Sequence, residues 1–211
     1  VATANVALGE DAFQRIIKEK HDANIMFLIQ QANVRSSELK TAKAFQEEVK
    51  AIGEAANKQI TNIEIAAYAS PDGSLDLNQG LAEKRQDATA KVVNKNLKKD
   101  KMEANVDTKY TAEDWEGFQE LVSKSNIQDK ELILRVLSMY KEPEQREQEI
   151  KNISSVYSDL ADEILPQLRR SRLTLNYEII GKSDEEIANL ADNNAKELSL
   201  EELLYAATLA K

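Results

Sequence analysis

The sequence has 211 residues, a hydrophobic content of 42%, a formal net charge of −9 and no cysteine. This length allows one full domain with additions, and the acidic balance argues against nucleic acid or an anionic membrane surface as partner. The lack of cysteine excludes disulfides and thiolate chemistry. No apolar run approaches the roughly 18 residues of a membrane-spanning helix. No secretion signal is present, and because the chain begins at Val1 we expect a trimmed or mature fragment.

The N-terminal third predicts a strand, a helix and a second strand. Residues 23–30 form an apolar run typical of a strand, whereas residues 13–20 fit either an edge strand or a short helix. Ser36 and Ser37 can cap a helix with one apolar stripe, which we expect to run to about residue 57. Residues 63–69 alternate as a strand, and Ile63, Ile65 and Ala67 point to one side of it.

A sharp turn at residues 70–73 then leads into a long helix. Pro71 fixes one backbone angle of this turn, and Ser74 is a candidate N-cap. The side of the helix that we expect to be buried is apolar at helical spacing: Leu77, Leu81, Ala88 and Val92. Asn78 and Arg85 share a different stripe, so their side chains can converge with Tyr68, Ala69 and Ser70 at a rim beside the strand end.

The C-terminal half predicts a third strand at residues 104–110, a helical segment and a closing strand at residues 173–180. Three amphipathic helices are expected between them, the third beginning at Pro143 and ending at Pro166. Two capping boxes, Ser183 with Glu186 and Ser199 with Glu202, then each start a short amphipathic helix. One helical hairpin cannot bury its own apolar side, so this tail, which resembles a tetratricopeptide hairpin, predicts the start of a repeat array.

Residues 67–86 carry a specific motif. They align without a gap to the pattern G-[HY]-T-D-x-x-G-S-x-x-x-N-x-x-L-S-x-x-R-A, and this stretch resembles the OmpA-like peptidoglycan-binding domain. The resemblance covers roughly residues 23–110 and 169–181. It implies an α+β fold: a βαβα core with a mixed sheet, a helical insertion before the last strand and a helical C-terminal tail. The expected domain is 1–182 with its insertion at about 112–168, followed by a helical hairpin at 183–211.

The resemblance also implies a ligand site. In the family, the Asp of T-D and the Arg of R-A clamp the zwitterionic end of diaminopimelate in the peptidoglycan stem peptide. Arg85 keeps the Arg column, whereas Ser70 stands in the Asp column and brings no charge. Arg172 matches an Arg near the ligand in the family's closing strand. The candidate ligand-binding residues are therefore Ala69, Ser70, Asn78, Arg85 and Arg172.

Each of these candidates also has a structural interpretation. Arg85 can pair with a carboxylate on the surface of its own helix, and Asn78 can tie the turn to the helix start. Arg172 belongs to a basic run with Arg169 and Arg170, which can be a solvated or salt-bridged cluster. Asp72 can substitute for the missing carboxylate, and Tyr68 can be a pocket wall or a satellite core residue.

Catalysis has no supporting constellation. His21 is the only histidine and lies far in sequence from any nucleophile motif. A zinc site needs three or four ligands, which one histidine cannot provide. We therefore expect a protein that is not an enzyme, with no catalytic residue, no metal and no cofactor.

Two functional hypotheses remain open. The first is a cell-wall module that anchors an outer-membrane-associated protein to peptidoglycan in the periplasm. The second is a protein-interaction scaffold on the same fold that has lost peptidoglycan binding. The second is motivated by Ser70, by the helical insertion and by the repeat-like tail.

Overall fold

The computed structural model describes residues 9–210, with backbone alone for residues 154–156. Its centre is one four-stranded sheet in the order β1-β4-β2-β3. The strands are β1 (Ile16–Met26), β2 (Lys58–Tyr68), β3 (Val106–Thr111) and β4 (Arg170–Ile180). β2 and β3 are parallel, while β4 lies antiparallel to both β1 and β2. The predicted α+β class with a mixed sheet is confirmed.

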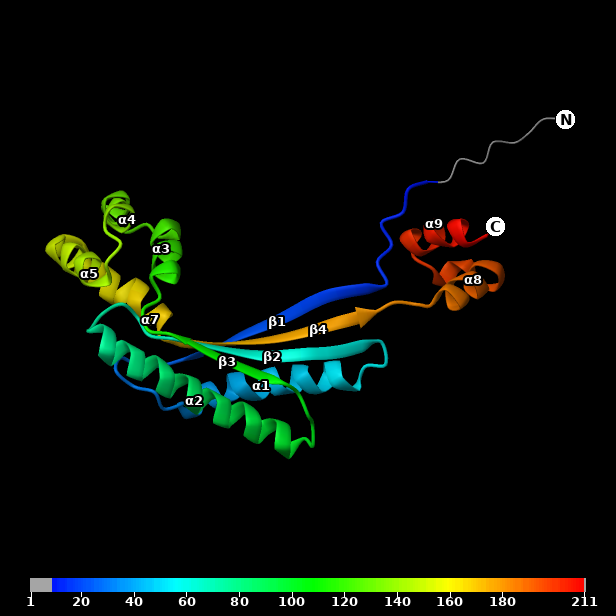
Figure 1. Ribbon diagram of the computed structural model, residues 1–211, viewed down its shortest axis with the longest axis horizontal. Helices are drawn as coiled ribbons and strands as arrows, with labels where there is room; N and C mark the ends of the chain where they lie inside the picture. Colours follow the sequence, from blue (N-terminus) through cyan, green and yellow to red (C-terminus); the bar gives the residue numbers. More distant parts are fainter. Residues whose placement is uncertain (1–8, 211) are drawn as a thin grey trace.

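Two helices, α1 (Ser36–Glu54) and α2 (Leu75–Lys99), cover one face of this sheet (Figure 1). The odd-numbered strand residues point into this layer, so Ile63, Ile65 and Ala67 are fully buried, as the alternation predicted. The core between the layers is apolar: Ile25, Phe45, Val49, Ile52, Val93, Leu97, Leu173 and Leu175. Burial of apolar surface contributes about 25 cal/mol of stabilising free energy for each Å² removed from water, so this apolar layer stabilises the sheet.

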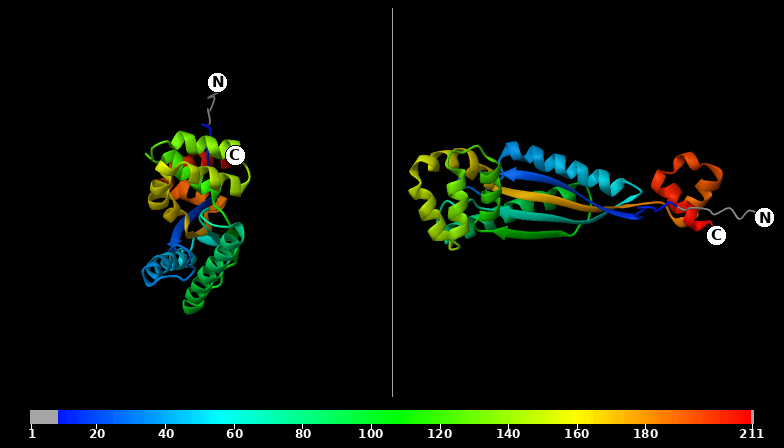
Figure 2. Two further views of the ribbon diagram at one scale, coloured as in Figure 1. Left: turned by 90° about the vertical axis from the view of Figure 1, so that its left-hand side faces the viewer. Right: turned by 90° about the horizontal axis from the view of Figure 1, so that it is seen from above.

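The opposite face of the sheet is polar. Even-numbered residues form hydrogen-bonded rows across the strands, such as Thr174 to Asp22 (2.6 Å) and Asn176 to Asn62 (2.9 Å). Within residues 9–210, two helical groups rise above this face at its two ends and leave its middle uncovered (Figures 1 and 2). The molecule is therefore elongated, and the middle of this sheet face has no helical cover among the described residues.

Several predicted element boundaries need correction. β1 begins at Ile16, so most of the ambiguous stretch at 13–20 is strand, and residues 28–30 lie outside the strand. Helix α1 ends at Glu54, and β3 begins at Val106 instead of residue 104. The N-cap prediction is confirmed, because the Ser74 side chain accepts a hydrogen bond from the Leu77 amide.

The buried stripe of α2 was predicted on the wrong residues. Leu77 is 51% exposed, and the buried residues lie one position along the helix: Asn78, Ala82, Arg85, Thr89, Val93 and Leu97. Three of these six are polar. Periodicity of apolar residues alone therefore pointed to the neighbouring stripe.

The insertion forms its own helical layer at one end of the sheet. It contains α3 (Trp115–Lys124), α4 (Lys130–Met139), α5 (Pro143–Asn152), α6 (Ser154–Asp159), a π-helical turn (Leu160–Ile164) and α7 (Leu165–Leu168). Pro143 occupies the first turn of α5 as predicted. The expected third helix is divided at Ile153, where α5 ends, and its last part continues past Pro166 to Leu168. Pro166 lies in the first turn of α7, where a missing N–H is tolerated.

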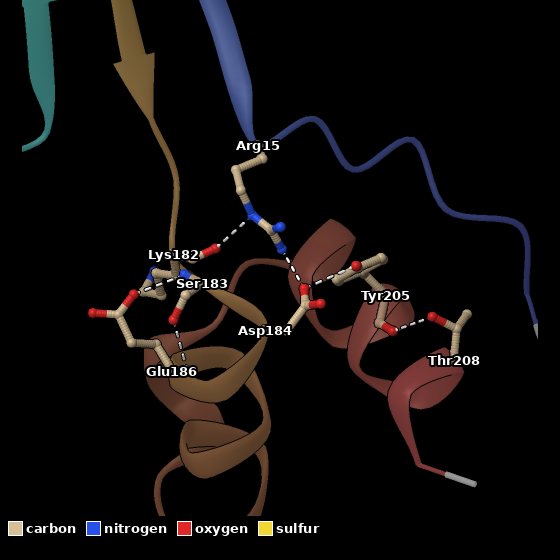
Figure 3. Close-up of polar contacts among 7 residues, drawn as sticks. All are labelled: Arg15, Lys182, Ser183, Asp184, Glu186, Tyr205 and Thr208. Carbon is tan, nitrogen blue, oxygen red and sulfur yellow. Dashed lines mark hydrogen bonds and ion pairs between the residues drawn. The ribbon is translucent and has the colours of Figure 1, made fainter.

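The C-terminal hairpin, α8 (Asp184–Asn193) and α9 (Leu200–Leu209), lies at the other end of the sheet. Both predicted capping boxes are present. The apolar side of the hairpin is covered by the segment before β1, where the Phe13 ring stacks on Tyr205 at 4.4 Å between centroids. Arg15 pairs with Asp184, which also accepts a hydrogen bond from the Tyr205 hydroxyl at 2.9 Å (Figure 3).

This stacking predicts that Phe13 holds the hairpin in place. The substitution Phe13→Ala should speed amide hydrogen exchange in α8 and α9 by about tenfold or more, because an aromatic pair contributes about 0.5–1.5 kcal/mol beyond its buried area. Amides of β2 should be unchanged in the same experiment. The matched control Leu200→Ala removes a side chain that is 70% exposed and should leave the exchange unaltered. Equal exchange in the two variants would contradict this role for Phe13.

Candidate functional site

Arg85 lies inside the protein, where the ends of two strands meet α2. Its side chain is 0% exposed. Nε donates to the Gln31 carbonyl at 2.9 Å, Nη1 to the Tyr68 carbonyl at 3.0 Å and Nη2 to the Leu28 carbonyl at 3.1 Å. The guanidinium also lies 5.2 Å from the centroid of the Phe27 ring. Every nitrogen of the fork is therefore engaged with the chain itself.

The pKa of Arg85 is lowered to about 10, mainly by burial and to a smaller extent by the nearby positive charge of Arg169. This pKa is still far above neutral, so the guanidinium is charged under ordinary conditions. The charged form suits three carbonyl acceptors, since charge-assisted hydrogen bonds are the stronger ones.

Ser70 is 4% exposed and lies within a small polar cluster at the turn after β2. Its hydroxyl donates to the Asp72 carboxylate, and Nε of Arg169 donates to the Ser70 oxygen at 3.3 Å. Nη2 of Arg169 is 3.2 Å from the same carboxylate, in an ion pair whose side chains are 11% and 14% exposed. Asp72 thus supplies a negative charge beside Ser70, and the cation it holds is Arg169 of the same chain.

Asn78 and Ala69 are also occupied by internal contacts. Nδ2 of Asn78 donates to the Gly73 carbonyl and to Glu113, both at 3.3 Å, which supports its interpretation as a tie between turn and helix. The Ala69 amide donates to the Thr111 carbonyl, and its own carbonyl accepts from the Asp114 amide, both at 3.2 Å. Both residues are buried, with Asn78 3% and Ala69 0% exposed.

The predicted rim therefore needs correction. Ser70, Asn78 and Arg85 do lie at one end of the sheet, but they face the protein interior. A ligand carboxylate could reach Arg85 only by displacing main-chain carbonyls. The alternative of an Arg85 paired with a surface carboxylate is also wrong, because its acceptors are carbonyl oxygens. Burial of a polar stripe on α2 is the physical reason for both errors.

The basic run divides into three different environments. Arg169 belongs to the turn cluster described above. Nη1 of Arg170 pairs with Asp114 at 2.8 Å, and its guanidinium lies 4.4 Å from the centroid of Tyr68. Arg172 is exposed and lies 5.9 Å from the same ring. The salt-bridged interpretation thus holds for Arg169 and Arg170, whereas Arg172 faces solvent.

Two hollows flank Arg170 and Arg172 on the open face of the sheet. One has a volume of about 630 Å³ and is bounded by Tyr68, the two arginines and residues of α3. The other, of about 310 Å³, lies on the side of Asn24 and Met26 in β1. Of the predicted candidates, Arg172 is the one that lines these hollows.

Reasoning from the sequence missed Asp114 as a structural residue. Asp114 caps α3 through the Gly117 amide at 2.9 Å and is 4% exposed while it pairs with Arg170. An available signal was the Asp before an amphipathic helix, which is typical of an N-cap. The Asp114–Arg170 pair itself has no local signal, because 56 residues separate the partners.

Neither a metal centre nor a membrane span is found within residues 9–210. No group of three or more histidines and carboxylates is placed to hold a metal ion there. Over the same residues, no helix combines the length and the apolar character that crossing a bilayer requires.

Comparisons with known proteins find matches among solved structures. No protein-family profile matches the sequence, and no curated protein matches it. Among solved structures, the chain is similar to the OmpA-like domain of FopA1 from Francisella tularensis subsp. tularensis SCHU S4, with a TM-score of 0.39 and 13% sequence identity. The match covers 77% of this chain and 74% of that chain. Roles for individual residues therefore rest on the contacts described above.

The carbonyl contacts predict a large stability effect at Arg85. The substitution Arg85→Met should lower the free energy of unfolding by at least about 3 kcal/mol, because it removes three hydrogen bonds from a charged donor, each worth about 1.5–3 kcal/mol. Arg85→Lys should lose less stability than Arg85→Met, because lysine keeps the positive charge. It should still be less stable than the wild type, because one ammonium group cannot reach three divergent acceptors.

Urea denaturation measures this difference. The matched control Arg172→Met removes an exposed arginine and should stay within about 0.5 kcal/mol of the wild type. An Arg85→Met variant as stable as that control would contradict a structural role for Arg85.

Proposed function

We propose that this chain is a non-catalytic binding module that acts as a protein-interaction scaffold. The observation that carries the proposal is the internal use of Arg85. A guanidinium with three main-chain acceptors and no exposed surface is not available to clamp a stem-peptide carboxylate. The Ser70 turn supports the same conclusion, because Arg169 already fills the place beside Asp72 that a ligand ammonium would need.

The shape and chemistry of the sheet support a protein partner. The uncovered face carries mixed polar side chains, such as Lys20, Asp22 and Asn24, and it lies between the two helical groups (Figures 1 and 2). Exposed apolar side chains lie on both groups, among them Met139 at 65% and Leu200 at 70% exposed. A polar surface flanked by helical groups that carry exposed apolar residues is compatible with a protein interface. The apolar fraction of such an interface is similar to that of the remaining protein surface.

Peptidoglycan binding is the second candidate function. Its support is the gapless resemblance of residues 67–86 to the OmpA-like pattern, together with the exposed Arg172 beside a hollow. A location in the periplasm at the outer membrane belongs to this candidate and rests on the same resemblance. It requires a ligand pose that avoids Arg85.

Site-specific photo-crosslinking in the cells that make the protein separates the two candidates. A photoreactive amino acid at Asn24, which is exposed on the open face, should form adducts that protease removes and lysozyme leaves intact. The matched control is the same amino acid at Lys91, an exposed position on α2, where no adduct is expected.

Pull-down with diaminopimelate-type peptidoglycan complements this experiment. The wild-type protein should be retained no better than an acidic control protein without affinity for the wall. Lysozyme-sensitive adducts at position 24, or saturable retention on peptidoglycan, would overturn the scaffold proposal in favour of wall binding.

A further inference from the structure

The hollow of about 630 Å³ between α3 and the open face of the sheet is lined by one arginine, Arg172, whose guanidinium donors are not used by the described part of the chain. Arg170 pairs with Asp114 at 2.8 Å, and Glu120 pairs with Lys124 at 2.6 Å. The Arg172 side chain has no hydrogen bond or ion pair among the described residues, although it lines this hollow and the neighbouring one of about 310 Å³.

Arg172 is mounted on a rigid base. It lies in β4, a central strand, and both sequence neighbours, Ser171 and Leu173, are fully buried. Across the sheet it is opposite Asn24 on one side and Ala66 on the other, so a short side chain leaves space next to it. The strand therefore holds the arginine at a fixed place, which lowers the ordering cost of binding.

Tyr68 gives the hollow an aromatic wall. Arg170 lies 4.4 Å and Arg172 5.9 Å from its ring centroid, so the ring carries two cations, one of them neutralised by Asp114. An arginine placed near an aromatic face is restricted in its rotamers while its N–H donors stay available at the edge of the fork.

The charges of the lining select the kind of ligand. Asp114, Glu116 and Glu120 line the same hollow as the two arginines, so the site carries more negative than positive side chains. These carboxylates repel a phosphate or another polyanion more strongly than a ligand group with a single negative charge. A single carboxylate fits the free guanidinium fork with two parallel hydrogen bonds, and the acidic wall tolerates a neutral or positively charged body attached to it.

We infer that this hollow is a carboxylate-binding site in which Arg172 holds the carboxylate of a peptide segment beside the Tyr68 ring. The inference deepens the proposed scaffold function and rests on it, because it names the chemical group of the partner that docks on this face of the sheet. The carboxylate can come from a peptide C-terminus or from an acidic side chain, and both present the same group to Arg172.

NMR titration of the whole chain with small probes tests the site. N-acetyl-alanine offers a terminal carboxylate, aspartate blocked at both main-chain ends offers a side-chain carboxylate, and N-acetyl-alaninamide offers none. The two acids should shift the Arg172 Nε–H signal and the Tyr68 ring signals saturably, and the amide should not. Binding by one acid alone would support the site and identify the source of the carboxylate.

The variant Arg172→Gln should weaken binding of the acids on the order of ten- to a hundredfold, the value of one hydrogen bond to a charged group. The matched control Lys20→Gln removes one positive charge from the same sheet face at a different place, because Lys20 lies opposite Asn176 whereas Arg172 lies opposite Asn24. This variant should bind the acids as the wild type does. Shifts that stay linear in concentration, or that are equal in Arg172→Gln, would overturn the site. Loss of the site with unchanged crosslinks from position 24 would leave the scaffold proposal standing.

Discussion

One buried guanidinium holds together the end of the sheet on which the candidate site was expected. Arg85 of α2 binds the carbonyls of Leu28, Gln31 and Tyr68, so it joins the chain after β1, the last residue of β2 and the helix that covers both. A charge in the interior is costly unless it is fully hydrogen-bonded, and here each nitrogen has an acceptor. The cation therefore fixes the path of the loop after β1 against the end of β2.

Other polar contacts at this end follow from that arrangement. With β2 held at Tyr68, its continuation at Ala69 bonds to Thr111 and Asp114, and Asp114 then pairs with Arg170. The next residue, Ser70, joins the Asp72 and Arg169 cluster. The result is a chain of internal contacts from α2 to the insertion, in which charged groups that resemble a ligand clamp serve the fold instead.

The long sheet separates two helical groups that differ in how they are held. The insertion has its own core, with Phe118, Val122, Ile133 and Leu160 among its buried residues, and is attached through the Asp114 region. The C-terminal hairpin has a small core and depends on Phe13 and Arg15 from the segment before β1. The hairpin therefore finds within the described chain a partner for its apolar side, which sequence reasoning assigned to further repeats.

The sequence alone determined the elements whose signals are local. Alternation placed the buried face of β2, and the Ser-x-x-Glu spacing placed both capping boxes. The resemblance of residues 67–86 to the OmpA-like pattern implied the mixed α+β sheet. It also selected Arg172, which lines a hollow, together with Arg85, which does not. Which of two arginines is open to a ligand has no local signal.

Only the tertiary structure decided the roles of these polar residues. The acceptors of Arg85 lie 17 to 57 residues away in the sequence, and Asp114, whose carboxylate pairs with Arg170, lies 56 residues from it. Side-chain type and spacing report the pattern along one element, whereas burial of a charge depends on whether distant segments bring enough acceptors to replace water. For this reason the sequence predicted the frame of the domain, and the packing of its loops decided which cation stays free.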